Sequence, residues 1–421
     1  MTIPARPGLR QALVAFRYPN YRRFWVGALL SNTGSWLQAV TIPFVVYGLT
    51  ASASWVGVAG FLQFAPAVVA GPIGGSIADR FHRRNVLLVT QSLAALVALA
   101  LWAVWVSGVR SLAVVLALVA VGGLVVGVNI PSWQAFVSEL VPREVLLNAV
   151  TLNSTQFNAA RAFGPALGGL VLGTLGVGWA FLLNAGSFLA VLAALAAIRV
   201  PRLARPAGPG GSLRDELRAT ARSVRKRPGI VACFVIVAAL GALGSPVFQM
   251  LVVFAEEVFV VGDIRYGLLG AALGVGAIVT APFVAGPGAG MRRSRLITLA
   301  VLAYGAAVVA FALAPGYAAG LAALVVVGGG YLAIASTLNT TIQIQVDEAV
   351  RGKVLAVYLM LLTAALPAGV LAQGLLVEAI GPRAAVALAG GAFLAVVGWL
   401  RWGTGLVARM DDLPGGQSSS S

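Results

Sequence analysis

Residues 75–84 read Gly-Ser-Ile-Ala-Asp-Arg-Phe-His-Arg-Arg, a short charged stretch between two long apolar runs. The first run covers about 54–78 and the second about 85–107, and each is long enough to cross the ~30 Å hydrocarbon core of a bilayer as a helix. Arginines between two such helices indicate the cytoplasmic side, because cytoplasmic loops carry an excess of Lys and Arg. The stretch therefore predicts a helical hairpin that crosses a membrane twice, with its turn in the cytoplasm.

The composition extends this interpretation to the whole chain. Of the 421 residues, 59% are hydrophobic and only 10% are charged, whereas soluble domains are about 25% charged. This excludes a soluble globular protein, a disordered chain and a fibrous protein. The apolar residues form continuous runs rather than alternating segments, which favours a helical bundle over an outer-membrane barrel. We expect an all-α membrane protein with twelve transmembrane helices at about 24–49, 54–78, 85–107, 112–138, 147–174, 176–198, 230–255, 266–288, 295–314, 318–344, 353–377 and 382–404.

The net charge of +16 is explained by topology. An even number of spans places both termini on one side, and nearly all of the 29 Lys and Arg residues fall on that side. The opposite side carries only Arg110, Arg265 and Arg383, and Arg161 lies inside a span. The preference for Arg over Lys is typical of a GC-rich bacterial genome. We expect a multi-pass protein of the bacterial inner membrane with both termini in the cytoplasm, and no nucleic acid among its partners.

A polar segment at 199–229 divides the spans six and six. It separates an N-terminal half at 1–198 from a C-terminal half at 230–404, and 405–421 is expected to be a disordered cytoplasmic tail. Within the segment, 212–228 has the pattern of an amphipathic helix, which fits either an anionic membrane surface or a solvated linker. Val-Ala-Gly-Pro occurs at 69–72 and again at 284–287, in equivalent spans. Two pseudo-symmetric six-helix halves predict a substrate site between them, near the middle of the membrane.

The charged stretch resembles the signature loop of the major facilitator superfamily, which reads Gly, three residues, Asp, a basic residue, any residue, Gly and two basic residues. His82 stands where the family has the second glycine, and the matching residues are Gly75, Asp79, Arg80, Arg83 and Arg84. The resemblance implies the family's twelve-helix fold in two halves, transport by alternating access, and an inner gate at this cluster that loosens during the cycle.

The chemistry of the cluster fits such a gate. Gly75 allows two helices to approach closely. Asp79 can accept hydrogen bonds from the backbone amides at a facing helix N-terminus. Arg83 or Arg80 can pair with Glu139, which lies at the cytoplasmic end of span four. The alternative is an ordinary positive-inside loop that happens to contain an aspartate.

Span five contains a second signature, at residues 164–169. Gly164, Pro165, Gly168 and Gly169 match the Gly-Pro-x-x-Gly-Gly core of a motif associated with exporters of the superfamily. Together with segments 20–25, 140–144 and 158–165, it resembles the bacterial efflux subgroup that includes the enterobactin exporter. The same glycines also suit plain helix packing, so export follows less directly from them than transport does.

Arg161 is the residue most indicative of a substrate site. It lies about 21 Å into span five, where a charge is costly unless it is paired or faces water, and is functional by default. Arg161 can attract a polar or anionic part of a substrate, or instead bond structurally to carbonyls and amides. Other polar residues in the spans can line the same cavity or join helices through hydrogen bonds, and those predicted to line it are Gln38, Asn129, Asn158, Gln249, Asn339 and Gln343.

These features predict a secondary active transporter that exports a small amphipathic molecule, a drug or siderophore-like metabolite, driven by the proton gradient. No acidic residue lies mid-span, so proton coupling rests on the resemblance, with Glu256 or Glu378 as shallow candidates. The alternatives are uptake, uniport, a lipid-type transporter, a pore, or a non-transporting receptor or assembly partner. No enzyme motif, cofactor site or metal-binding cluster is recognised. The resemblance implies a monomer.

Overall fold

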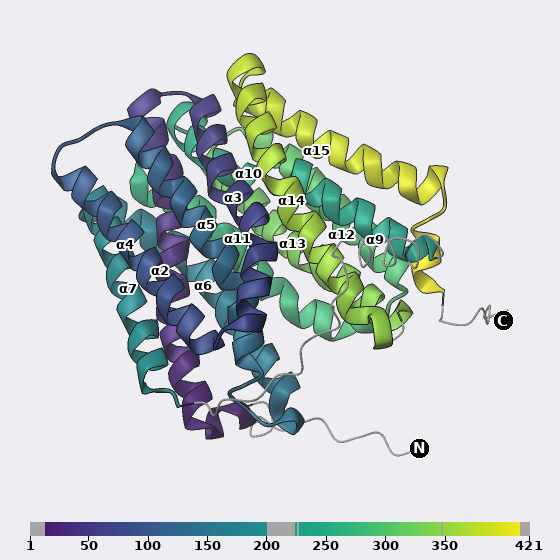
Figure 1. Ribbon diagram of the computed structural model, residues 1–421. Helices are drawn as coiled ribbons and strands as arrows, with labels where there is room; N and C mark the ends of the chain where they lie inside the picture. The colour runs from purple at the N-terminus through teal and green to yellow at the C-terminus, as the bar shows by residue number, and fades with distance from the viewer. Residues whose placement is uncertain (1–12, 200–223, 225–226, 347, 413–421) are drawn as a thin grey trace. The chain divides into compact units, whose positions relative to one another are not determined.

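The computed structural model describes residues 13–199, 224, 227–346 and 348–412. The predicted amphipathic helix at 212–228 therefore lies almost entirely outside the described residues. Every regular element within the described residues is a helix. Twelve long helical runs follow the predicted spans, with ends that differ from the predicted ones by a few residues (Figure 1).

The first six runs are single helices. They are α2 (Pro19–Thr50), α3 (Ala53–Arg80), α4 (Arg83–Val106), α5 (Leu112–Val137), α6 (Leu146–Thr174) and α7 (Val177–Ala197), with short 3-10 turns η1 (Val14–Arg17) and η2 (Arg143–Val145). α4 packs against both α5 and α7.

Among the last six runs, one is interrupted by a π-helical turn and another ends in one. The interrupted run consists of α9 (Pro228–Ala239), η3 (Leu240–Gly244), α10 (Val247–Val253) and η4 (Phe254–Val258). It is followed by α11 (Asp263–Ala285), the 3-10 turn η5 (Pro287–Gly290), α12 (Arg293–Ala312), α13 (Tyr317–Gln345), α14 (Glu348–Ile380), α15 (Pro382–Gly398), the π-helical turn η6 (Trp399–Gly403) and the 3-10 turn η7 (Ala408–Asp411).

Ten of the twelve runs are long and apolar enough to cross a membrane. The other two are α2 and α6, which have 32 and 29 residues. Both are long enough to cross a bilayer, but they are more polar than the other ten runs. In α6, for example, Gln156, Asn158 and Arg161 lie within six residues of one another. Polar side chains inside membrane helices mark positions that face protein or water rather than lipid. The two least apolar helices are therefore the first place to look for a functional site.

The helices form two compact units. Unit 1 contains Met1–Val45 and Ala65–Ala204, and unit 2 contains Val46–Phe64 and Arg205–Ser421. The segment Val46–Phe64, here called the α2–α3 hairpin, thus belongs to unit 2, although the rest of α2 and α3 belongs to unit 1. The sequence division into 1–198, a linker at 199–229 and 230–404 remains a prediction.

Unit 1 has an aromatic core at the end of the helices that carries Arg83 and Arg84, here called the basic end. Tyr21, Phe24 and Phe136 are fully buried there. The Tyr21 hydroxyl donates to the carbonyl of Ala149 at 2.7 Å, and the Trp25 indole donates to the carbonyl of Leu152 at 2.9 Å. These bonds fix α2 against α6, because a buried hydroxyl or indole needs a partner.

In unit 2, glycines allow α11 and α13 to pack closely. A Cβ atom on Gly276 would lie 1.8 Å from the carbonyl oxygen of Val325, and one on Gly328 would lie 1.8 Å from that of Leu273. Only glycine fits at such distances, so this interface uses the small-residue packing of membrane helices.

The predicted tail starts as an ordered segment. Residues 405–412 are folded, and Val407 and Met410 are fully buried. The Asp411 carboxylate accepts a hydrogen bond from the backbone N–H of Ser294 at 3.0 Å, which caps the N-terminus of α12. The expectation of a disordered tail from residue 405 is therefore wrong for these first residues, because apolar burial and a helix cap hold them. Residues 413–421 lie outside the described part.

Candidate functional site in unit 1

Arg161 lies in the middle of α6. Fifteen residues separate it from Leu146 and thirteen from Thr174, which places it about 20 Å from either end of the helix. Its side chain is half-buried. A guanidinium at this depth is stable only where protein groups or water replace its hydration, so the position marks a polar interior site.

An aromatic ring of α2 lies next to this charge. The Arg161 guanidinium carbon is 5.5 Å from the centre of the Trp36 ring, within the range of a cation–π contact. Trp36 in turn meets Phe157 of α6 edge-on, with ring centres 5.9 Å apart. Phe157 is exposed. The site therefore combines one cation with two aromatic side chains, and so offers both charge and apolar surface to a ligand.

The span-five glycines bring α2 and α6 together at this point. A Cβ atom on Gly164 would lie 2.4 Å from the Cβ of Trp36, and one on Gly168 would lie 2.5 Å from Val40. Pro165 and Gly169 are buried in the same stretch. Each proline in a helix removes one backbone hydrogen bond. Whatever the stretch does in transport, it packs the helix that carries Arg161 against the helix that carries Trp36.

Gln38 and Asn129, two unit 1 residues that were predicted to line the substrate cavity, form hydrogen bonds between helices. Gln38 accepts a hydrogen bond from the Asn184 side chain at 2.6 Å. Asn129 accepts from Thr90 at 2.8 Å and from Gln91 at 3.1 Å. Both side-chain oxygens are thus occupied by neighbouring helices, as in other interhelical contacts of membrane proteins.

Asn158 differs from those two residues. Its side chain is exposed, and it donates at 2.9 Å to the carbonyl of Ser154, one turn back on the same helix. Among the predicted polar residues of unit 1, Asn158 is therefore the most exposed, while Gln38, Asn129 and Arg161 are all half-buried.

The predicted residues of unit 2 fall into two groups. Gln249 is buried and donates to Gln63 of the α2–α3 hairpin at 3.4 Å. Asn339 accepts a hydrogen bond from Gln343, one turn along α13. Gln373 of α14, another polar residue of the predicted spans, is 3% exposed, and neither of its side-chain polar atoms has a partner within the described residues. The Gln249 side-chain oxygen is also unpartnered there.

Such buried polar atoms are costly, at about 1–3 kcal/mol each. They are positions in unit 2 where water or a ligand would find a hydrogen-bond partner, as is the Ser245 hydroxyl.

The charged stretch at the basic end forms an ion pair. Arg83 donates to Glu139 and to the carbonyl of Ala135, both at 3.1 Å. Arg84 donates at 2.6 Å to the carbonyl of Leu195, near the C-terminus of α7, where a cation is favourable. Asp79 and Arg80 are exposed, and neither side chain has a hydrogen bond or ion pair within the described residues. The structure therefore brings Arg83, rather than Arg80, to Glu139.

The close approach expected at Gly75 occurs one residue earlier. A Cβ atom on Gly74 would lie 2.7 Å from the Cα of Val128, whereas one on Gly75 would meet nothing within 4 Å. The expectation for Gly75 is wrong in this structure because successive residues of a helix point about 100° apart, and Gly74 is the one that faces α5.

At the opposite end of the helices, two glutamates bind the α2–α3 hairpin within unit 2. The Tyr47 hydroxyl donates to Glu257 at 2.6 Å. The Ser52 hydroxyl and the Ser54 backbone N–H donate to Glu378 at 2.9 and 3.2 Å. The sequence analysis identified Glu378 only as a shallow acid. The partners of both glutamates are more than 200 residues away in the chain, so no local pattern could reveal them.

The backbone is strained on both sides of these contacts. Ala51 and Val260 have φ values of +48° and +50°, and they are the non-glycine residues of the described part with positive φ. A β-branched residue such as Val260 is rarely found there. Strain of this kind persists only where surrounding contacts impose it. No group of three or more His, Cys, Asp or Glu residues that could hold a metal occurs among the described residues.

The comparisons with known proteins agree with this architecture. A family model described as transmembrane secretion effector, a branch of the major facilitator superfamily, matches residues 10–410. The chain belongs to the major facilitator superfamily. It is therefore a multi-pass membrane protein of a transporter family, with twelve helices in the fold of that superfamily, and no catalytic family is indicated.

Curated relatives match part of this major facilitator protein. An uncharacterized transporter of the superfamily from Bacillus subtilis, YfiS, is 30% identical over 161 residues, which are 38% of this chain and 37% of the relative. The enterobactin exporter EntS of Shigella flexneri is 27% identical over 176 residues, which are 42% of this chain and 43% of the relative. The chain thus matches about two fifths of the length of these relatives.

Solved structures match nearly the whole chain. A bacterial homologue of the human lysosomal transporter Spinster has a TM-score of 0.72 at 14% identity, covering 94% of this chain and 97% of that one. A peptide transporter of the POT family has a TM-score of 0.74 at 14% identity, with 97% of each chain covered. At such identities the likeness shows the fold.

Proposed function

We propose that this protein is a secondary active transporter that exports a small amphipathic molecule, a drug or siderophore-like metabolite, by alternating access. The observation that carries the proposal is Arg161 beside Trp36 at mid-depth of α6. A half-buried cation next to aromatic rings suits a ligand that has an anionic or polar group on an apolar body. The transporter family and the partial similarity to enterobactin exporters support the same class of ligand.

Candidate ligand-binding residues occur in each unit, taken by itself. Unit 1 supplies Arg161 and Asn158, together with the aromatic side chains of Trp36 and Phe157. In unit 2, the unpartnered polar atoms of Gln249 and Gln373 support a role in hydrogen bonding to the polar part of the substrate. Asn339 and Gln343 remain candidates on α13.

The direction of transport rests on two supports. The Gly-Pro-x-x-Gly-Gly core at 164–169 resembles the exporter motif, and EntS is by name an exporter. The distribution of Arg and Lys supports an orientation with the basic end and both termini in the cytoplasm of the bacterial inner membrane. On this orientation the α2–α3 hairpin faces the outside. We expect a monomer.

The two ends of the helices supply the gates of the cycle. On the cytoplasmic side, the Arg83–Glu139 pair joins the start of α4 to the end of α5, next to the last turn of α3, where the Asp79 side chain can bind a helix N-terminus when the inner gate closes. On the outer side, the bonds of Glu257 and Glu378 to the hairpin must break for the outer gate to open. Proton coupling fits these carboxylates, since protonation weakens a carboxylate as an acceptor.

Efflux from pump-deficient cells tests the proposal. Cells that express the wild type, Arg161→Ala or Arg110→Ala would be loaded with a panel of amphipathic dyes and siderophores, with and without a protonophore. Arg110 is the control, because it stacks on Trp105 at the opposite end from the basic loop and is outside the site. We expect efflux by the wild type and Arg110→Ala, and none by Arg161→Ala or with the protonophore.

The outcomes also separate the alternatives. Net accumulation instead of efflux indicates uptake, and movement that is insensitive to the protonophore and follows the substrate gradient indicates uniport. Binding of a ligand without flux indicates a receptor or assembly partner. Full efflux activity of Arg161→Ala, at equal expression, would show that Arg161 is not part of the substrate site.

A further inference from the structure

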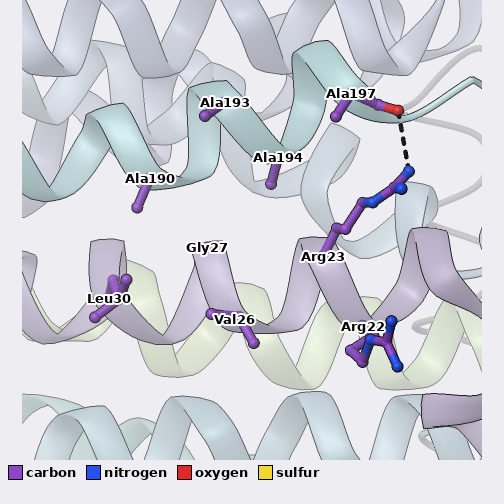
Figure 2. Close-up of a pocket in the computed structure, with 9 residues that line it drawn as sticks. All are labelled: Arg22, Arg23, Val26, Gly27, Leu30, Ala190, Ala193, Ala194 and Ala197. Carbon is purple, nitrogen blue, oxygen red and sulfur yellow. Dashed lines mark hydrogen bonds between the residues drawn. The ribbon is translucent and has the colours of Figure 1, made fainter.

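A groove runs between α2 and α7 on unit 1, with a volume of about 450 Å³ (Figure 2). Arg22 and Arg23 line its end near the start of α2. Its walls are apolar and come from Val26 and Leu30 on α2, and from alanines on α7 such as Ala193. The groove thus has two guanidinium groups at one end and hydrocarbon along the rest.

Small residues create this groove. A Cβ atom on Gly27 would lie 2.9 Å from the carbonyl oxygen of Ala190, so glycine allows α2 and α7 to pack closely at that point. Beside the contact, α7 presents only methyl groups, while Val26 and Leu30 remain 48% and 50% exposed. An apolar face that protein leaves uncovered on a membrane-spanning helix lies against lipid chains. The groove therefore opens to the bilayer.

The arginines lie at the level of the lipid headgroups. α2 has 32 residues and is about 48 Å long, which exceeds the ~30 Å hydrocarbon core by several residues at each end. Arg22 and Arg23 are the fourth and fifth residues of the helix, and Trp25 follows them, as aromatic residues do at a membrane interface. From Arg22 to Leu30 the groove extends about 12 Å toward the membrane centre.

The groove has a surplus of positive charge. Neither 1–78 nor 145–214 contains an acidic residue. Arg23 donates to the carbonyl of Ala197 at 3.4 Å, at the C-terminus of α7 (Figure 2). Arg22 is exposed, and its side chain has no hydrogen bond or ion pair within the described residues. An anionic group at this end would meet two cations and no competing carboxylate from either segment.

We propose that this groove binds an anionic phospholipid of the inner leaflet, with its phosphate on Arg22 and Arg23 and the upper part of an acyl chain along Val26, Leu30 and Ala193. The positive charge of the groove disfavours binding of the chain's own linker, because 199–228 is itself rich in arginine. The assignment to the inner leaflet rests on the orientation proposed above, whereas the binding itself does not depend on transport.

Lipid titrations of the purified full-length protein in detergent, followed by native mass spectrometry, test the proposal. Dioleoyl phosphatidylglycerol is compared with dioleoyl phosphatidylcholine, which has the same chains, and with glycerol phosphate, which has none. Arg22→Gln is the cleanest variant, since the Arg22 side chain bonds to no described residue. Arg17→Gln is the matched control, because Arg17 is exposed at the same end and does not line the groove.

We expect phosphatidylglycerol to bind more tightly than phosphatidylcholine. Arg22→Gln should weaken phosphatidylglycerol binding about fivefold, and Arg22→Gln with Arg23→Gln about 25-fold, with phosphatidylcholine unchanged. Arg17→Gln should bind as the wild type does. Ala193→Phe, which fills the apolar part, should weaken both lipids.

Three results would overturn the proposal. Equal binding of the two lipids would show that the negative charge of the headgroup is not recognised. An equal effect of Arg17→Gln and Arg22→Gln would indicate unspecific attraction to the basic end. Displacement of phosphatidylglycerol by glycerol phosphate, without any effect of Ala193→Phe, would indicate a site for a soluble anion.

Discussion

Gly164→Ala tests whether the site depends on the close approach of α2 and α6. The new Cβ atom would lie 2.4 Å from the Cβ of Trp36, 3.0 Å from the carbonyl oxygen of Thr33 and 3.2 Å from the backbone nitrogen of Leu37. Two of these atoms belong to the backbone of α2, and the third is fixed to it. No side-chain rotation can relieve the contact, so α2 must move.

The size of the effect follows from this geometry. Carbon atoms prefer separations of about 3.5–4.0 Å, so the helices must separate by about 1 Å. Overpacking of this kind costs roughly 1–3 kcal/mol. Replacing glycine by alanine inside a helix also stabilises by up to about 1 kcal/mol. Gly186→Ala in α7 supplies the control, because a Cβ atom there would meet nothing within 4 Å. The difference in unfolding free energy between the two variants therefore measures the cost of overpacking alone.

Unfolding of both variants in detergent measures this difference. We expect Gly164→Ala to be about 1–3 kcal/mol less stable than Gly186→Ala, and to lose transport as Trp36 moves relative to Arg161. Equal stability of the two variants would refute the packing role of Gly164. Normal stability with lost transport would instead assign the glycine to the motion of the cycle.

Other perturbations test the two ends of the helices. Glu139→Ala should lower the free energy of unfolding by roughly 1–3 kcal/mol, because it removes the partly buried partner of Arg83, and Glu139→Gln should lower it less. Tyr47→Phe should raise amide hydrogen exchange in the α2–α3 hairpin roughly fivefold by removing one hydrogen bond of about 1 kcal/mol. Hairpin exchange of the wild type should also increase in acid that protonates carboxylates, and Glu378→Gln should show fast exchange that depends less on pH.

The helices were predictable because continuous apolar runs and charged loops leave few alternatives in a membrane. The charge of Arg161 was equally visible, since depth in a span follows from counting residues along a helix. The partner of a buried group was harder to predict. Composition makes many Gln and Asn residues available, and only the structure shows that Gln38 and Asn129 are occupied by neighbouring helices.

Contacts between distant segments were not predictable. Tyr47 and Glu257 are 210 residues apart, and Ser52 and Glu378 are 326 apart. A single sequence holds no periodicity that links such pairs. The α2–α7 groove was hidden for a different reason: it depends on alanine and glycine, which are abundant throughout the chain and therefore carry little information at any one position.

α2 connects the three features described here, since it carries Arg22 of the groove, Trp36 of the site and Tyr47 of the hairpin. It changes from unit 1 to unit 2 between Val45 and Val46, and α3 changes between Phe64 and Ala65. An internal proline lies close to each position, Pro43 in α2 and Pro66 in α3.

A proline has no N–H to donate to the carbonyl four residues back, so a helix bends there at lower cost than elsewhere. The part of α2 before Pro43 therefore carries Arg22 and Trp36 together, while the part after it follows the glutamates of unit 2. Breaking the hairpin bonds need not displace Trp36 from Arg161, because α2 can bend at Pro43.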